Sequence, residues 1–191
     1  MLLNETDRQV LLGLAYQSIQ LGLDTGHPLS INLRDYSTAF SQQRATFITL
    51  EKNKQLRGCI GMLKAVLPLA EDVCENAFSA AFKDSRFPPL IQSELENIDI
   101  HISILSPSVE IEFSSEQDLV SKIQPDIDGL ILESGYRRGT FLPSVWQSIH
   151  TPVKFLQHLK QKAGLDKHFW SDQIRVYRYT TEVIGKESLS E

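Results

Sequence analysis

A predicted β-hairpin with two glycines in its second arm is the feature that most restricts how this chain can fold. Residues 45–50 are rich in β-branched and aromatic side chains, which favour a strand. A polar turn follows at residues 51–54, and residues 55–63 return as the second arm. Glycine inside a strand indicates a bulge or a close approach by another backbone or a ligand, and this arm contains both Gly58 and Gly61. The hairpin therefore predicts antiparallel pairing and marks its second arm as a candidate site.

Helices and strands alternate irregularly along the rest of the chain. We predict helices over residues 6–21, 68–83, 115–123 and 151–163, and strands over residues 98–105, 109–113, 130–133, 139–142 and 174–179. Thr6 and Gly22 are the expected first cap and last stop of the first helix. Because hairpins join several strands, the pattern favours an α+β fold with a mainly antiparallel sheet flanked by helices over a doubly wound parallel sheet.

The length and composition fit a globular protein of ordinary size. The chain has 191 residues, of which 41% are hydrophobic and 23% are charged, so it can build a complete hydrophobic core. Its net charge of -5 argues against a protein that coats nucleic acid. No apolar run approaches the length of a membrane span, and the first residues lack the pattern of a signal peptide. Cys59 and Cys74 cannot make a disulfide framework, so we expect a cytoplasmic protein with free thiols and no membrane association.

Local motifs for metals and cofactors are missing from the sequence. The five histidines have no metal-ligand spacing with each other or with the cysteines. The sequence also lacks a phosphate-binding glycine loop, a dinucleotide fingerprint, a zinc ribbon and a nucleophile elbow. We therefore expect neither a metal ion nor a cofactor.

Cys59 is the sharpest candidate for chemistry. It lies between the two glycines and next but one to Arg57, whose positive charge favours the thiolate, the reactive form of the side chain. By strand alternation the two side chains share a face unless a bulge shifts the phase. However, free cysteine is often buried as a small hydrophobe, and a nucleophilic cysteine usually needs a histidine base that the sequence does not identify. Cys59 is therefore a candidate catalytic nucleophile, with packing as the alternative.

Arg57 and four neighbouring candidates have the chemistry to bind a substrate or ligand. The planar guanidinium of Arg57 suits carboxylate or phosphate, and backbone N–H groups at Gly58 and Gly61 would add donors for an anion. Asp84 and Arg86 lie in a loop at a helix exit, where functional residues concentrate. A structural salt bridge from Arg57 to a carboxylate such as Asp84, and a helix-capping role for Asp84 and Arg86, are the alternatives.

Six blocks of the sequence, in order, resemble the AMMECR1 family. Residues 56–61 (LRGCIG) look like the six-residue signature of that family, residues 84–90 (DSRFPPL) like its D-x-R-F segment, and residues 102–107 (ISILSP) like its I-S-V-L-S-P strand. The later blocks are residues 128–130, 141–145 and 162–165. Two departures are visible: residues 141–145 read FLPSV where LLPQV is more usual, and Lys160 and Gln161 replace a cysteine often found before KAGL. A mechanism that needs that third thiol is in doubt for this chain.

The resemblance implies an architecture and a set of partners, but no established reaction. It implies a single domain over residues 5–185 with two unequal lobes, the larger built on the antiparallel sheet, and the signature near a cleft between them. We expect residues 186–191 to be a mobile, polar tail. Bacterial and archaeal members often resemble protein A of the AmmeMemoRadiSam system, which implies Memo-like and radical SAM proteins as partners.

Four interpretations of the signature are open. In the first, the protein is an enzyme or enzyme component whose cleft is lined by Arg57 and Cys59. In the second, it is an adaptor or binding module with a pocket for a small molecule or peptide. In the third, it is a nucleic-acid-linked regulatory protein, against which its acidic charge counts. In the fourth, the glycines serve a bulge and Cys59 only packs. The sequence favours the first two and does not separate catalysis from binding.

Overall fold

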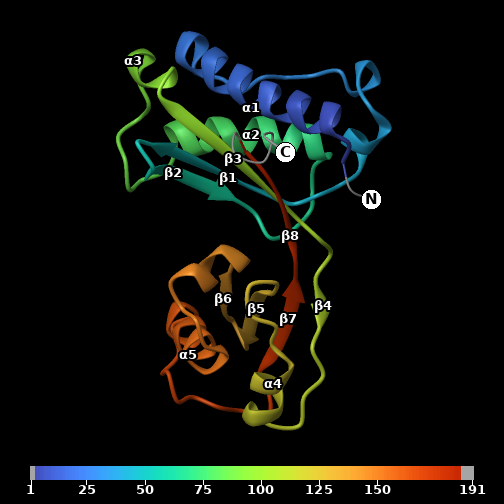
Figure 1. The fold of residues 1–191 in the computed structure, drawn as a ribbon, viewed down its shortest axis with the longest axis vertical. Coiled ribbons are helices and arrows are strands. Elements are labelled where there is room, and N and C mark those ends of the chain that lie inside the picture. The colour runs from blue at the N-terminus through green and yellow to red at the C-terminus, as the bar shows by residue number, and fades with distance from the viewer. Residues whose placement is uncertain (1–2, 186–191) are drawn as a thin grey trace. The chain divides into compact units, whose positions relative to one another are not determined.

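The computed structural model describes residues 3–185, which form two compact units. Of the described residues, one unit comprises residues 3–105 with 182–185, and the other comprises Ser106–Thr181. Each contains one four-stranded antiparallel sheet and its own helices (Figure 1), which confirms the predicted α+β class. The predicted tail, residues 186–191, lies outside the described residues. Within residues 3–185, no helix is both long and apolar enough to cross a lipid bilayer.

The first unit is a sheet covered on one face by two long helices. Its strand order is β2–β1–β3–β8, and α1 and α2 lie side by side over the same face (Figure 1). The elements are α1 (Glu5–Thr25), β1 (Thr46–Lys52), β2 (Gln55–Gly61), α2 (Leu69–Phe82), α3 (Gln92–Leu95), β3 (Ile98–Leu105) and β8 (Thr181–Ile184), with two 3-10 turns at Leu33–Asp35 and Thr38–Ser41. Ile48 and Leu50 of β1 are fully buried under the helices. Thr49, between them, therefore points to the opposite face of the sheet.

Helix α1 has different ends from those predicted. Its N-cap is Asn4, and its C-cap is Gly26, which has the left-handed φ of 76° that favours glycine. Gly22 lies inside the helix, where a Cβ atom would come within 2.5 Å of the Phe82 ring. The predicted cap Thr6 and stop Gly22 were therefore wrong, and close packing against α2 explains the glycine.

The second unit has the strand order β4–β7–β5–β6. Its elements are β4 (Val109–Glu110), α4 (Glu116–Lys122), β5 (Gly129–Ser134), β6 (Arg137–Phe141), a 3-10 turn (Pro143–Gln147), α5 (Pro152–Lys162) and β7 (Arg175–Tyr179). Its separate core centres on Trp146, which stacks on Phe155 at 3.9 Å between ring centroids. The indole N–H of Trp146 donates to the carbonyl of Asp128 at 2.8 Å, so this buried polar group is satisfied.

Candidate functional site

A β-bulge lies in the middle of the signature, at Arg57. Leu50 pairs with Gly58, whereas the next residue of β1 pairs with Leu56, so Arg57 is the extra residue of β2. The bulge confirms one of the two structures that the glycines predicted. It also shifts the phase of the strand, so simple alternation does not put Arg57 and Cys59 on one face.

The two glycines allow other backbone segments to approach β2 closely. A Cβ atom at Gly58 would lie 2.2 Å from the carbonyl oxygen of Ala80 in α2. A Cβ atom at Gly61 would lie 2.3 Å from the carbonyl oxygen of Thr46 in β1. Real Cβ atoms essentially never come this close, so both positions need glycine for packing. These contacts hold the strand that carries Cys59 against its neighbours.

Arg57 is bound to a carboxylate from α3. Its Nε and Nη2 atoms donate to the two oxygens of Glu94 at 3.1 and 2.8 Å, and Nη2 also donates to the carbonyl of Pro88 at 3.0 Å. Lys52 donates to the same carboxylate at 3.0 Å. The hydrogen bonds from Arg57, followed by that from Lys52, lower the pKa of Glu94 to about 2 against the cost of burial. The side chain of Arg57 is only 11% exposed, and its guanidinium therefore binds other groups of the protein itself.

Asp84 and Arg86 close the open edge of β2 at Cys59. The backbone N–H of Cys59 donates to Oδ2 of Asp84 at 2.8 Å, and Nη2 of Arg86 donates to the carbonyl of Cys59 at 3.3 Å. Arg86 also binds both oxygens of Asp84, at 2.9 and 2.7 Å. These bonds from Arg86 are the main reason that the pKa of Asp84 lies well below its usual range. The loop thus supplies the partners that an edge strand lacks.

The thiol of Cys59 lies opposite Thr49. The two residues are directly paired across β1 and β2, and the Thr49 hydroxyl donates to Sγ at 3.4 Å. Cys59 is a free, half-buried cysteine, so its sulfur is neither sealed in the core nor fully solvated. A hydroxyl donor stabilises negative charge on sulfur. The site therefore offers a positioned thiol with one polar neighbour.

His101 is the histidine aligned with this thiol, but it lies one strand further away. Thr49 pairs with His101 on β3 as well as with Cys59 on β2, so two strand spacings, about 10 Å, separate the backbones of Cys59 and His101. Nε2 of His101 instead lies 3.6 Å from Oε2 of Glu51. Among residues 3–185, the sulfur of Cys59 has no histidine within hydrogen-bonding distance.

One aromatic ring, that of Phe87, lies close to both arginines. The guanidinium carbons of Arg57 and Arg86 lie 5.9 and 5.5 Å from the centre of the Phe87 ring. The side chain of Arg86 is 54% exposed, compared with 11% for Arg57. Arg86, rather than Arg57, is therefore the cation of this site that solvent and ligands can reach.

The structure brings Cys59, Arg57, Asp84 and Arg86 into one region, but it gives Arg57 a different partner from the one considered. That partner is Glu94, whereas Asp84 binds Arg86. Glu94 was not predicted, because nothing in the sequence relates a one-turn helix to the bulge. Thr49 was not predicted either, because the bulge changes which residue of β1 lies opposite Cys59.

The other cysteine is part of the core. Cys74 in α2 is fully buried, and burial raises the pKa of its thiol to about 12. Within the part of the chain that the structure describes, no group of three His, Cys, Asp or Glu side chains is placed to hold a metal ion. The groups gathered around the signature are the thiol of Cys59, the hydroxyl of Thr49, the carboxylate of Asp84 and the exposed guanidinium of Arg86.

Known proteins resemble this chain over most of its length. The AMMECR1 family model matches residues 12–184. A protein of Methanothermobacter thermautotrophicus is 40% identical over 167 residues, which cover 83% of this chain and 85% of that protein. Protein MJ0810 of Methanocaldococcus jannaschii is 38% identical over 80% of this chain and 78% of its own length. The crystal structure of uncharacterized protein PH0010 from Pyrococcus horikoshii matches with a TM-score of 0.84 and 32% identity, covering 91% of this chain and 88% of that one.

Proposed function

This chain belongs to the AMMECR1 family, and we propose that it works through the thiol of Cys59 as one component of a multiprotein system. The placement of this thiol is the observation that carries the proposal. Two obligatory glycines, a bulge and the Asp84–Arg86 pair all fix the segment around one half-buried sulfur. Cys74, by contrast, is fully buried in the core, and its sulfur receives no hydrogen bond from a side chain of the described residues.

In this proposal Arg86 attracts a negatively charged group of the ligand, and Arg57 positions the strand. Arg86 is half exposed, whereas Arg57 is bound to Glu94. Cys59 then attacks an electrophilic carbon of the ligand. A carbon–sulfur bond forms, the thiol proton passes to solvent, and the leaving group departs with its electron pair. Resemblance to the AmmeMemoRadiSam proteins supports Memo-like and radical SAM proteins as partners, and two free thiols suit a reducing cytoplasm.

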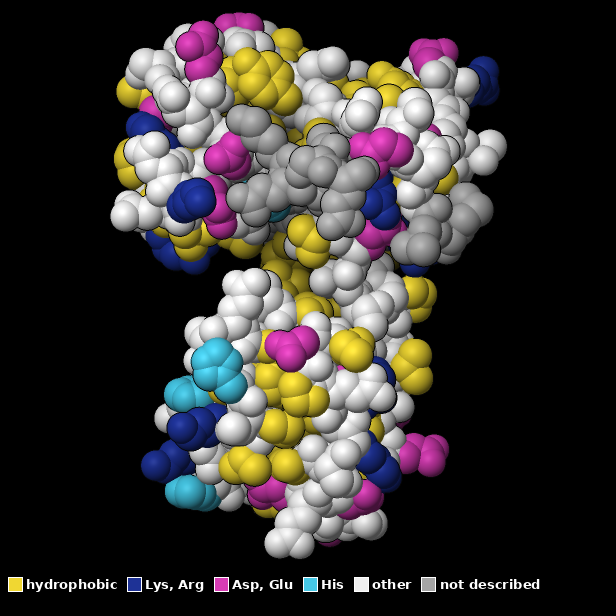
Figure 2. Space-filling view, in the orientation of Figure 1, with side chains coloured by type: hydrophobic (Ala, Val, Ile, Leu, Met, Phe, Trp, Pro, Cys, Tyr) yellow, Lys and Arg dark blue, Asp and Glu magenta, His cyan; other side chains and the backbone are white. Residues whose placement is uncertain are grey.

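A binding module without covalent chemistry is the second candidate. It is favoured by the position of His101, because a base two strands away cannot take the proton of Cys59 directly. In this case the same surface would hold a small molecule or a peptide without forming a bond. A nucleic-acid ligand has less support. The net charge is -5, and the Lys and Arg side chains on the face shown are scattered among acidic and uncharged ones (Figure 2).

Substitution of Cys59 separates the two candidates. We would reconstitute the protein with Memo-like and radical SAM proteins encoded in the same organism and measure product formation with wild type, Cys59→Ser and the control Cys74→Ala. Loss of activity in Cys59→Ser, with folding intact by circular dichroism, would support the covalent role. Full activity in Cys59→Ser would exclude that role and favour the binding module.

A further inference from the structure

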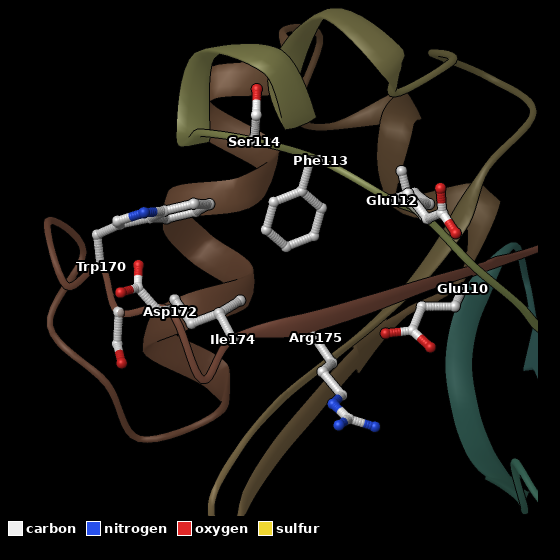
Figure 3. Close-up of a pocket in the computed structure, with 10 residues that line it drawn as sticks. Glu110, Glu112, Phe113, Ser114, Trp170, Asp172, Ile174 and Arg175 are labelled. Atoms are coloured by element: carbon white, nitrogen blue, oxygen red, sulfur yellow. The ribbon is translucent and has the colours of Figure 1, made fainter.

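A pocket of about 370 Å³ lies in the second unit, at the place where the chain leaves β4. Val109 and Glu110 pair with β7, and the backbone N–H of Ile111 still donates to the carbonyl of Val176 in β7 at 2.8 Å. The residues after Ile111 lead to α4. Figure 3 shows that the rings of Phe113 and Trp170 extend into the resulting hollow, with Ile174 across from them. The volume falls within the range of small-molecule sites.

The aromatic wall of this pocket consists of two rings set at an angle. The centroids of Phe113 and Trp170 are 5.6 Å apart, and the ring planes are inclined by 56°. Both side chains are only half-buried, so part of each ring faces the hollow. Two inclined π faces beside an open volume make a surface that attracts organic cations.

The charged residues of the pocket are mostly acidic. Glu110, Glu112 and Asp172 line it, with Arg175 as the single cation. Within residues 3–185, none of the three carboxylates has an ion-pair or side-chain hydrogen-bond partner, so their charge is available to a ligand. The guanidinium of Arg175 extends away from the two rings in Figure 3. The excess of negative charge favours a positively charged ligand.

Trp170 already contacts one ammonium group of the protein itself. Nζ of Lys160 lies 5.4 Å from the centre of the indole ring, and this lysine is fully buried in an ion pair with Glu116 at 2.6 Å. The ion pair of Lys160 and Glu116 has no net charge, so it does not cancel the negative charge of the carboxylates that line the pocket. The contact shows that the ring environment accommodates an ammonium ion.

We propose that this pocket binds the ammonium or guanidinium group of a small organic cation. The rings contact the apolar surface of the cation, and Glu110 and Asp172 neutralise its charge from either end of the hollow. An anionic ligand would meet three carboxylates against one guanidinium. The proposal is independent of the Cys59 site, because all residues of the pocket belong to the second unit.

The two tryptophans provide a direct test by nitrogen-15 NMR. The indole N–H signal of Trp170 should shift and saturate on titration with tetramethylammonium or methylguanidinium, but not with neutral tert-butanol. The signal of Trp146, which is buried and bonded to Asp128, serves as the internal reference. Absence of a saturable shift, or an equal response to tert-butanol, would overturn the proposal.

Variants then connect binding to the named carboxylates. The double substitution Glu110→Gln with Asp172→Asn should weaken binding by about tenfold. Asp126→Asn is the matched control, since this exposed carboxylate of the same unit lies outside the pocket and its φ of 65° suits asparagine. Equal weakening of binding by the double substitution and by Asp126→Asn would contradict the proposed site.

A peptide ligand separates a protein partner from a small molecule. Binding of a blocked lysine or arginine tripeptide, without binding of either free cation, would assign the pocket to a protein partner and reject a small-molecule ligand.

Discussion

Gly58 lies where the fold leaves no room for a side chain. Its missing Cβ is what lets β2 lie against the carbonyl of Ala80 in α2, at a distance of 2.2 Å from the Cβ position. Gly58→Ala should therefore lower the free energy of unfolding by about 1–3 kcal/mol, because backbone has to move. Urea unfolding at neutral pH measures the change.

A second glycine provides the control for this substitution. Gly13 lies within α1, and no heavy atom would come within 4 Å of an added Cβ. Gly13→Ala should leave the protein unchanged or raise its stability by up to about 1 kcal/mol through helix propensity. Equal destabilisation by both changes would mean that the contact with Ala80 is not what requires Gly58.

Thr49 should influence how fast Cys59 reacts. Its hydroxyl is the donor to Sγ, and Thr49→Val removes that donor while keeping the shape of the side chain. We expect alkylation of Cys59 by iodoacetamide at pH 7 to slow by about threefold to tenfold, because negative charge on sulfur loses its hydrogen bond. Mass spectrometry of the labelled peptides measures the rate, and buried Cys74 should remain unmodified throughout. An unchanged rate would show that the hydroxyl only packs against the sulfur.

At the scale of residues, the sequence makes Cys59 a candidate but does not predict which groups surround it. A two-residue turn that pairs Lys52 with Gln55 would, without a bulge, place Gly58 opposite Thr49. The extra residue at Arg57 moves Cys59 into that position. The glycines were the signal for a bulge, but its location depends on how α2 packs on β2, and local sequence does not contain that information.

At the scale of secondary-structure elements, the stability of the edge strand β2 depends on the side chains that bond to its open edge. Asp84, with its side chain only 5% exposed, accepts the N–H of Cys59 and both donors of Arg86. Asp84→Asn should lower the free energy of unfolding by about 1.5–3 kcal/mol, because charge-assisted bonds to a buried group are lost. Hydrogen exchange at the amide of Cys59 should accelerate in the same variant.

A surface pair in the second unit is the control for Asp84. Glu133 binds Arg138 at 3.1 Å, and the two side chains are 35% and 50% exposed, far more than that of Asp84. Glu133→Gln should change stability by less than about 1 kcal/mol and should not affect exchange at Cys59. If Asp84→Asn behaved in the same way, the loop would not be what closes the edge of β2.

Most helices and strands were predicted, including the short α4, β5 and β6, whereas α3, β8 and the exact ends of several elements were not. The alternating isoleucines of β3 and the predicted range 98–105 agree with the structure. Residues 174–179 were predicted as the last strand, yet β8 follows β7 after Thr180 and joins the sheet of the other unit. Asp72, in the acidic first turn of α2, is buried despite its charge and accepts hydrogen bonds from Thr46 and Asn76. In each case tertiary contacts, rather than local pattern, decide the outcome.

At the scale of the whole molecule, acid should affect the two units unequally. Arg57 lowers the pKa of Glu94 to about 2, and Arg86 holds that of Asp84 below its usual range. Below about pH 4.5 these two carboxylates bind protons in the unfolded chain but stay ionised in the folded protein. The stability that they contribute above that pH is therefore lost as the pH falls. For Glu94 the loss is about 3 kcal/mol at most. Burial raises the pKa of Asp72, so this carboxyl lowers the stability as the pH rises. Asp72 therefore does not cause the loss of stability in acid.

The two carboxyls whose pKa falls furthest, those of Glu94 and Asp84, belong to the first unit. The second unit contains Asp118, whose pKa is lowered to a smaller extent, mainly by the hydrogen bond from the backbone N–H of Ser114. Both tryptophans also belong to the second unit, so the two units can be followed separately. α1 and α2 contain 21 and 14 residues, compared with 7 and 11 in α4 and α5, so circular dichroism at 222 nm mainly follows the first unit. Fluorescence of Trp146 and Trp170 follows the second, which has its own hydrophobic core. Between pH 5 and pH 2.5, the thermal midpoint from circular dichroism should fall further than that from fluorescence. Glu94→Gln should reduce the difference, because it removes one of the two carboxyls that cause it. Coincident midpoints at every pH would show that the units unfold together and that acid does not act on the first unit alone.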